Sequence, residues 1–286
     1  MTKAPYTLCL PQVQSTPVVF ASPHSGRDYP WEFLRQSVLD ERAIRSSEDA
    51  FVDLLFGCAP EFGAPLLAAT APRAFIDLNR SADELDPALI EGVRRSTHNP
   101  RVTSGLGVIP RVVANGRAIY RGKLPLDDAR GRLRQHWRPY HDRLQALLDD
   151  TRAIRGEAIL IDCHSMPHEA IDSVGTAGTP HPQIVLGDRF GAAAASGIVD
   201  RIEAAFANAG LRVVRNSPFA GAYTAQHYGR PSRGQHVVQV EIDRSLYMNE
   251  RLVRPNSGFQ DFQALMRGVI AELTQIGQAD LPLAAE

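Results

Sequence analysis

The chain of 286 residues carries 31 Lys and Arg against 32 Asp and Glu, and 44% of its residues are hydrophobic. This balance is typical of a globular protein and argues against disorder along most of the length. A net charge of −1 provides no basic field for nucleic acid or for an anionic membrane, so a small-molecule substrate is the expected partner.

The cysteines and the N-terminal segment indicate a compartment. Cys9, Cys58 and Cys163 are too few and too scattered for a disulfide framework or an all-cysteine zinc site. The segment MTKAPYTLCLPQVQ has no apolar signal core, and no window approaches the roughly 18 to 20 apolar residues that a membrane span needs. We therefore expect a soluble, cytoplasmic protein, and the sequence leaves a homo-oligomer open.

Short apolar runs alternate with amphipathic segments along the chain. The apolar runs predict strands at residues 17–24, 65–70, 74–79, 158–164, 183–187, 211–216 and 236–243. The amphipathic segments predict helices at residues 38–58, 126–151, 189–209 and 258–277. The alternation predicts one α/β domain over residues 1–286, in which helices flank a mixed, mainly parallel sheet.

Two long polar segments interrupt this alternation. Residues 81–121 and 216–235 are rich in Gly and Pro and weakly periodic. Connections of this length in a compact domain are commonly walls or lids of an active site.

Chemistry-bearing residues stand at the ends of the predicted strands, where open α/β sheets bind ligands. These residues are His24, Asn79, Arg80, Asp162, His164, Glu241 and Arg244. Two imidazoles, a carboxylate and an open position are the usual ligand set of a catalytic zinc ion. No local His-Glu-x-x-His pattern is present, so such a site has to be assembled from distant segments.

The residues alone leave open which acid would be the third metal ligand. Glu48 and Asp49 are predicted to stand at the start of a helix with Ser46 or Ser47 as N-cap, and acids there are more typical of a complement to the helix dipole than of a metal ligand. His24 alone is more typical of a hydrogen-bonded loop histidine.

Two further residues have alternative interpretations. Glu241 interrupts the apolar run VVQVEI, and a carboxylate in such a strand must be paired, metal-bound or shifted in pKa. Cys163 could serve as a nucleophile in a cysteine hydrolase, although buried cysteine usually behaves as a small hydrophobic residue.

Six segments together resemble the N-formylglutamate amidohydrolase family. They are SPHSG, SEDAFVD, DLNR, DCHS, NSPFAG with Tyr223, and VEIDRSLYM, and they occur in the order and approximate spacing of that family between residues 17 and 270. The family is similar to zinc carboxypeptidases and aspartoacylases, which implies the same sheet flanked by helices.

The resemblance also implies a function and a site. It implies a Zn²⁺ ion held by His24, His164 and one acid of the pair Glu48 and Asp49. It implies Glu241 as the general base, and Asn79 with Arg80 as the grip on a substrate carboxylate. Further candidates for the substrate pocket are Tyr223, Arg121 and Arg244. The expected reaction is hydrolysis of N-formyl-L-glutamate; a related N-acyl amino acid deacylase, a carboxypeptidase-like enzyme and a non-catalytic metal-binding or ligand-binding domain are the alternatives.

Overall fold

A computed structural model describes residues 4–94, 99–171 and 181–278. Within these ranges, seven strands form one sheet in the order β1-β3-β2-β4-β7-β5-β6. The outer pair β1–β3 and the pair β7–β5 are antiparallel, and the other four pairs are parallel. The strands are β1 (Tyr6–Cys9), β2 (Val18–Ser22), β3 (Leu66–Ala69), β4 (Ala158–Met166), β5 (Ile184–Gly187), β6 (Val213–Arg215) and β7 (Gln235–Asp243). The predicted mixed, mainly parallel sheet is confirmed.

The two central strands determine where the site lies. β4 and β7 pair in parallel over nine residues, and every residue of both is buried. Strands covered on both faces need apolar side chains on both, which explains their continuous hydrophobic runs. The register places His164 directly beside Glu241 near the carboxyl ends of the two strands.

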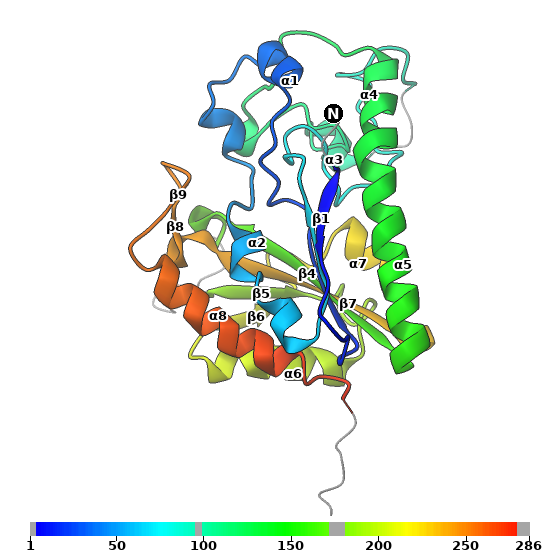
Figure 1. Cartoon of the computed structure of the whole chain (residues 1–286). Coiled ribbons are helices and arrows are strands. Elements are labelled where there is room, and N and C mark those ends of the chain that lie inside the picture. The colour runs from blue at the N-terminus through cyan, green and yellow to red at the C-terminus, as the bar shows by residue number, and fades with distance from the viewer. Residues whose placement is uncertain (1–3, 95–98, 172–180, 279–286) are drawn as a thin grey trace, which may run out of the picture.

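Helices cover both faces of the sheet (Figure 1). The long helix α5 (Arg138–Arg155) lies on one face, and α6 (Ser196–Asn208) with α8 (Phe259–Leu273) lies on the other. Along β4, Leu160 packs into the α5 core, whereas Ile161 and Cys163 pack into the core with α6 and α8. This alternation follows from the two-residue period of a strand.

Shorter elements surround this core. They are α1 (Trp31–Gln36), α2 (Val52–Leu55), α3 (Pro100–Thr103), α4 (Leu126–Arg132), α7 (Tyr223–Tyr228), and the hairpin β8 (Met248–Asn249) and β9 (Arg254–Pro255). A π-helical turn, Leu133–Trp137, joins α4 to α5. Helices α1, α3 and α4 lie above the sheet in Figure 1, together with the described residues of the polar segment 81–121.

Two predicted elements are wrong. Residues 74–79 form no strand: the N–H groups of Phe75 and Ile76 donate to the Pro72 carbonyl in a turn, and Asp77 N–H donates to the Val108 carbonyl. The helix expected over 38–58 is broken because Phe51 adopts φ 68°, a left-handed conformation that ends helical propagation.

The broken helix changes the environment of Glu48 and Asp49. Only a 3₁₀ turn at Ala43–Arg45 and the single turn of α2 form there, and the N-cap of α2 is Phe51 rather than Ser46 or Ser47. Glu48 and Asp49 precede that helix, so they do not sit in its first turn as predicted.

The other predicted elements are found with shifted bounds. The helix expected from residue 189 begins only at Ser196, because Arg189, Phe190 and Gly191 all have positive φ. Strand β1 and helix α1 were not predicted; β1 is half-exposed at the sheet edge and lacks a continuous apolar run.

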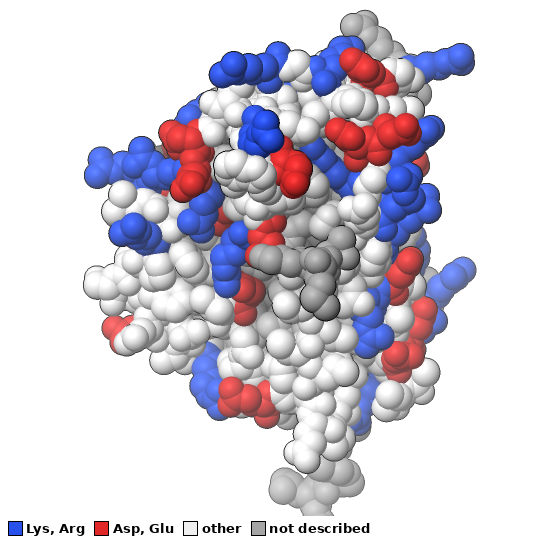
Figure 2. Space-filling view, turned by 45° about the horizontal axis from the view of Figure 1, so that its top comes forward, with Lys and Arg blue, Asp and Glu red and all other residues white. Residues whose placement is uncertain are grey.

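The surface agrees with the near-neutral composition. On the face shown in Figure 2, basic and acidic side chains are interspersed. Among the described residues, no helix has both the length and the apolar character to cross a membrane.

Candidate active site

His24 lies in the turn that follows β2. Ser22 Oγ donates a hydrogen bond to Ser25 Oγ over 2.9 Å inside this turn. A Cβ atom on Gly26 would lie 2.2 Å from the Ala71 carbonyl oxygen, so the close approach of the two backbones requires glycine. The SPHSG segment thus holds His24, which is 2% exposed, in one position.

Asp49 is brought to His24 by the backbone. Its N–H donates to the His24 carbonyl over 3.1 Å. Its side-chain Oδ2 then lies 3.4 Å from His24 Nδ1 and 2.9 Å from His164 Nδ1. The three side chains form one buried group whose ligand atoms all lie within 4.8 Å of one another.

A second carboxylate holds the far nitrogen of each imidazole. His24 Nε2 donates to Asp77 Oδ1 over 2.8 Å, and His164 Nε2 lies 3.1 Å from Asp162 Oδ2. Both rings therefore direct Nδ1 toward the centre of the group. Such carboxylate–histidine pairs orient imidazole ligands in metal sites.

The donor set fits a metal ion. Buried polar atoms normally have a hydrogen-bond partner, but His24 Nδ1 has none among the described residues. Two imidazole nitrogens and one carboxylate oxygen that converge in this way could hold a divalent metal with one open position.

Electrostatics keep the Asp49 carboxylate ionised. Burial opposes the charge of Asp49, yet the hydrogen bond from His164 and the nearby His24 imidazole hold its pKa well below its usual value. Burial likewise disfavours the charge on His164, but the Asp162 carboxylate and the hydrogen bond to Asp49 raise the pKa of this imidazole. A metal that binds here must displace the proton between His164 and Asp49.

Glu241 stands beside this group on β7. It is 8% exposed, and burial raises its pKa to about 7, although the His164 charge acts in the opposite direction. Gln239, two residues earlier on the same face, donates from Nε2 to Glu241 Oε1 over 2.9 Å. Its own Oε1 accepts from Ala222 N–H, which fixes the orientation of the amide.

A cavity of about 660 Å³ opens over His24, His164 and Glu241. Asn79, Arg80 and Arg244 also line it. Arg80 is held by bonds from Nε to the Leu106 carbonyl and from Nη1 to the Asn79 carbonyl.

Arg244 makes contacts of a different kind. Its Nη2 donates to Asp49 Oδ1 over 2.9 Å, and its Nε donates to Ser165 Oγ. The guanidinium thus holds the acidic member of the metal-binding group.

Three of the predicted site residues belong neither to the metal-binding group nor to the lining of this cavity. Glu48 accepts hydrogen bonds from Tyr29 Oη and from Arg45 Nε and Nη2, so both of its oxygens are used elsewhere. The Tyr223 ring stacks on His227 with centroids 4.9 Å apart. Arg121 is exposed. None of the three lines the cavity, so the geometry offers no support for their predicted roles.

Other residues of the site were not predicted. Arg73, Arg101 and Gln239 all line the cavity. Gln239 could have been found, because residues two apart on a strand share a face and Glu241 was already a candidate. Arg73 comes from a turn and Arg101 from the single turn of α3, and neither element is long enough for a period in the sequence to place its side chain.

Cys163 points away from the site. Its side chain packs in the core with α6 and α8, on the opposite face of the sheet from His164. Burial raises the pKa of this thiol well above its ordinary value. A buried, protonated thiol is a poor nucleophile, so the geometry argues against a cysteine hydrolase.

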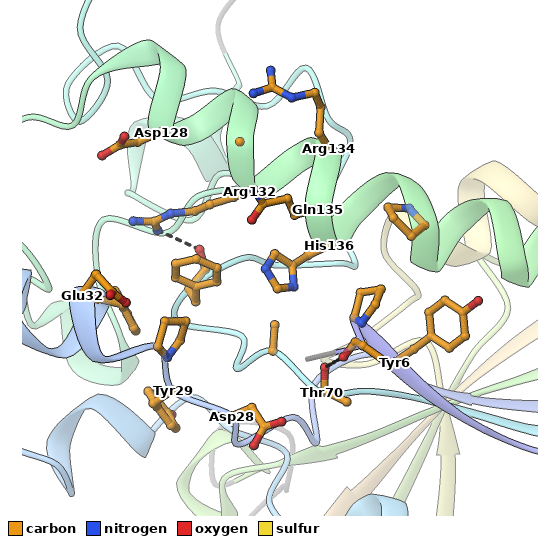
Figure 3. Close-up of a pocket in the computed structure, with 18 of the residues that line it drawn as sticks. Tyr6, Asp28, Tyr29, Glu32, Thr70, Asp128, Arg132, Arg134, Gln135 and His136 are labelled. Atoms are coloured by element: carbon orange, nitrogen blue, oxygen red, sulfur yellow. Dashed lines mark hydrogen bonds between the residues drawn. The ribbon is translucent and has the colours of Figure 1, made fainter. Parts of the chain in front are cut away.

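A second, larger hollow of about 1520 Å³ lies between the N-terminal segment and α4 (Figure 3). His136 and Gln135 point into it, and Arg132, which also lines it, donates to the Phe75 carbonyl. None of the predicted site residues lines it. The cavity over His24 and His164 is therefore the candidate active site.

Comparisons with known proteins agree with this geometry. Residues 16–248 match the family model described as N-formylglutamate amidohydrolase. The chain is 30% identical over 268 residues to the N-formylglutamate deformylases of Pseudomonas aeruginosa and of Pseudomonas putida, and each alignment covers 91% of both chains.

A solved structure is similar over nearly the whole chain. The crystal structure of an N-formylglutamate amidohydrolase from Ralstonia eutropha JMP134 is 35% identical, with a TM-score of 0.88. The match covers 96% of this chain and all of the other.

Proposed function

The chain belongs to the N-formylglutamate amidohydrolase family, and from this premise we propose that it hydrolyses N-formyl-L-glutamate, or a related N-acyl amino acid, to formate and the free amino acid. The relatives named for this activity match nine-tenths of the chain. The buried group of His24, Asp49 and His164, which leaves one imidazole nitrogen without a hydrogen-bond partner among the described residues, is the observation that carries the proposal. We also propose that residues 1–286 act as one catalytic domain in the cytoplasm.

We assign His24, Asp49 and His164 as the ligands of a zinc ion. Zinc prefers imidazole and carboxylate ligands in such sites, and when bound it supplies Lewis-acid chemistry that polarises the amide carbonyl and activates water near neutral pH. Asp77 and Asp162 orient the two imidazoles, and Arg244 orients Asp49.

Glu241 is the proposed general base. The reaction forms a bond between a water oxygen and the formyl carbon and breaks the C–N bond, so a proton must move from water to the departing nitrogen. A carboxylate whose pKa lies near 7 can both take and return this proton, a contribution of about 10² to 10⁴ in rate. Gln239 keeps the carboxylate in place.

Arg80 is proposed to hold the α-carboxylate of the substrate. Asn79 lies beside it, with Oδ1 accepting from Thr224 N–H and Nδ2 lying 3.1 Å from His164 Nε2. Arg80 Nη2 makes no hydrogen bond to a described residue, whereas Nε and Nη1 are anchored to carbonyl groups. The guanidinium is therefore fixed and still has a donor for an anion in the cavity.

The substitution Glu241→Gln tests this assignment. It keeps the size and the hydrogen-bonding oxygen of the side chain but removes the base. Formate release from N-formyl-L-glutamate should fall by about 10² to 10⁴ while the bound zinc stays near the wild-type level. Glu61→Gln, at an exposed glutamate 59% accessible that pairs with Arg267, is the matched control and should leave activity unchanged. Undiminished formate release by Glu241→Gln would contradict the assignment.

A further inference from the structure

Among the described residues, four arginines line the active-site cavity, and they differ in their partners. They are Arg73, Arg80, Arg101 and Arg244. Arg73 pairs with Asp77 at 3.0 Å, and Arg244 pairs with Asp49 at 2.9 Å. Arg80 is anchored to two carbonyl groups. The Arg101 guanidinium makes no hydrogen bond or ion pair with any residue in the described ranges, so it is the cavity arginine with all its donors available.

The backbone of Arg101 is nevertheless bonded to the same residue that anchors the Arg80 side chain. Leu106 N–H donates to the Arg101 carbonyl over 2.8 Å, and the Leu106 carbonyl accepts from Arg80 Nε over 3.0 Å. One residue thus connects the two arginines. Arg111 fixes the same turn from the other side, because its Nη2 donates to the Thr103 carbonyl and its N–H to the Gly105 carbonyl.

Two like charges on one wall of a cavity favour an anion between or beside them. Burial lowers the pKa of Arg80, and the neighbouring charges of Arg73 and Arg101 lower it further. The two guanidinium groups differ in depth: Arg80 is 6% exposed, whereas Arg101 is exposed at the mouth.

The proposed substrate carries two carboxylates at different distances from the amide. The α-carboxylate is attached to the carbon that bears the amide nitrogen, so it must lie deep in the cavity, near Arg80 and Asn79. The side-chain carboxylate carbon is three carbon–carbon bonds from that carbon, against one for the α-carboxylate, and can reach outward.

We propose that Arg101 binds the side-chain carboxylate of the substrate and thereby selects acidic over neutral N-formyl amino acids. The inference rests on the proposed hydrolysis of N-formyl amino acids at this site and names the residue that gives it specificity. A guanidinium can bind a carboxylate through two parallel hydrogen bonds, which gives direction as well as attraction.

The test compares two substrates of nearly equal size, N-formyl-L-glutamate and N-formyl-L-glutamine, in wild type and Arg101→Gln. The substitution should lower kcat/KM for the glutamate substrate by about 10- to 100-fold, mainly through KM, and should change the glutamine substrate by less than about 3-fold. Arg101→Lys, which keeps the charge, should recover part of the preference. Arg233→Gln, at an exposed arginine beside the opposite end of β7, is the control and should leave both values unchanged.

A binding measurement separates this inference from the proposed function. Calorimetric titration of L-glutamate and L-glutamine should show that Arg101→Gln weakens only glutamate binding. Wild type that hydrolyses neither substrate would contradict the proposed function, and the titration would still decide the role of Arg101. An equal effect of Arg101→Gln on both ligands, or no effect on either, would overturn the inference.

Discussion

Arg244 Nη2 donates a hydrogen bond to Asp49 Oδ1 over 2.9 Å, which joins residues 195 positions apart. The bond occupies one oxygen of the carboxylate, so only Oδ2 faces His24 and His164. The guanidinium also donates to Ser165 Oγ and to the Ser46 carbonyl. This set of contacts indicates that Arg244 orients a metal ligand, whereas the sequence predicted that it binds the substrate.

The substitution Arg244→Lys separates these two roles. Lysine keeps the charge but cannot reproduce the fork that reaches Asp49 and Ser165 together. We expect zinc affinity, measured by competition with a chelator, to fall by about 10- to 100-fold, as for other residues that orient metal ligands. KM at saturating zinc should stay within about 3-fold of wild type. A large rise in KM with normal zinc affinity would instead support the substrate-binding role.

The adjacent acids Glu48 and Asp49 give a second prediction. Asp49 faces both imidazoles, whereas both oxygens of Glu48 are bonded to Tyr29 and Arg45. We therefore expect metal analysis to find no bound zinc in Asp49→Asn, because a neutral amide is a much weaker zinc ligand than a carboxylate.

Glu48→Gln is the matched control for that substitution. It should keep one zinc per chain, although the loss of a buried ion pair should lower the free energy of unfolding by about 1 to 3 kcal/mol. Loss of zinc in Glu48→Gln with zinc retained in Asp49→Asn would reverse the assignment.

His141 should make stability depend on pH. Burial lowers its pKa to about 3, and the ring lies between the Leu78 carbonyl and Tyr228 Oη. Between pH 3 and 6.5 the unfolded chain binds a proton here that the folded chain does not, so stability falls as the pH falls below 6.5.

Urea unfolding at pH 6 and pH 5 checks this sign. Wild type should lose about 1 kcal/mol more over this step than His141→Gln, which lacks the titrating group. His227→Gln, whose ring is exposed on α7, should alter the loss much less. Equal losses in wild type and His141→Gln would show that His141 does not titrate as the structure implies.

The sequence predicted the position of a site residue correctly where that residue lies in one periodic element. His164 and Glu241 lie on long, fully buried strands, and their register makes them neighbours as a parallel sheet requires. The resemblance to the family was confirmed by the match over residues 16–248.

The sequence was a weaker guide to structure in short and irregular segments. Residues 74–79 have the composition of a buried strand, yet they form a turn that carries Asp77 to His24. A turn and a buried strand can have the same apolar content, and only the tertiary hydrogen bonds distinguish them. For the same reason Arg101 could not be placed, because α3 is a single turn capped by the Asn99 side chain within a long polar connection.

Metal dependence is the central claim, and one titration tests it most directly. Protein stripped of metal with a chelator is titrated with Zn²⁺ while bound zinc and the rate of formate release from N-formyl-L-glutamate are measured on the same samples. We expect the rate to rise in proportion to bound zinc and to reach its plateau at one zinc per chain, and we expect His164→Ala to bind none at that affinity. Full formate release from metal-free protein, or a plateau of bound zinc without any formate, would contradict the account.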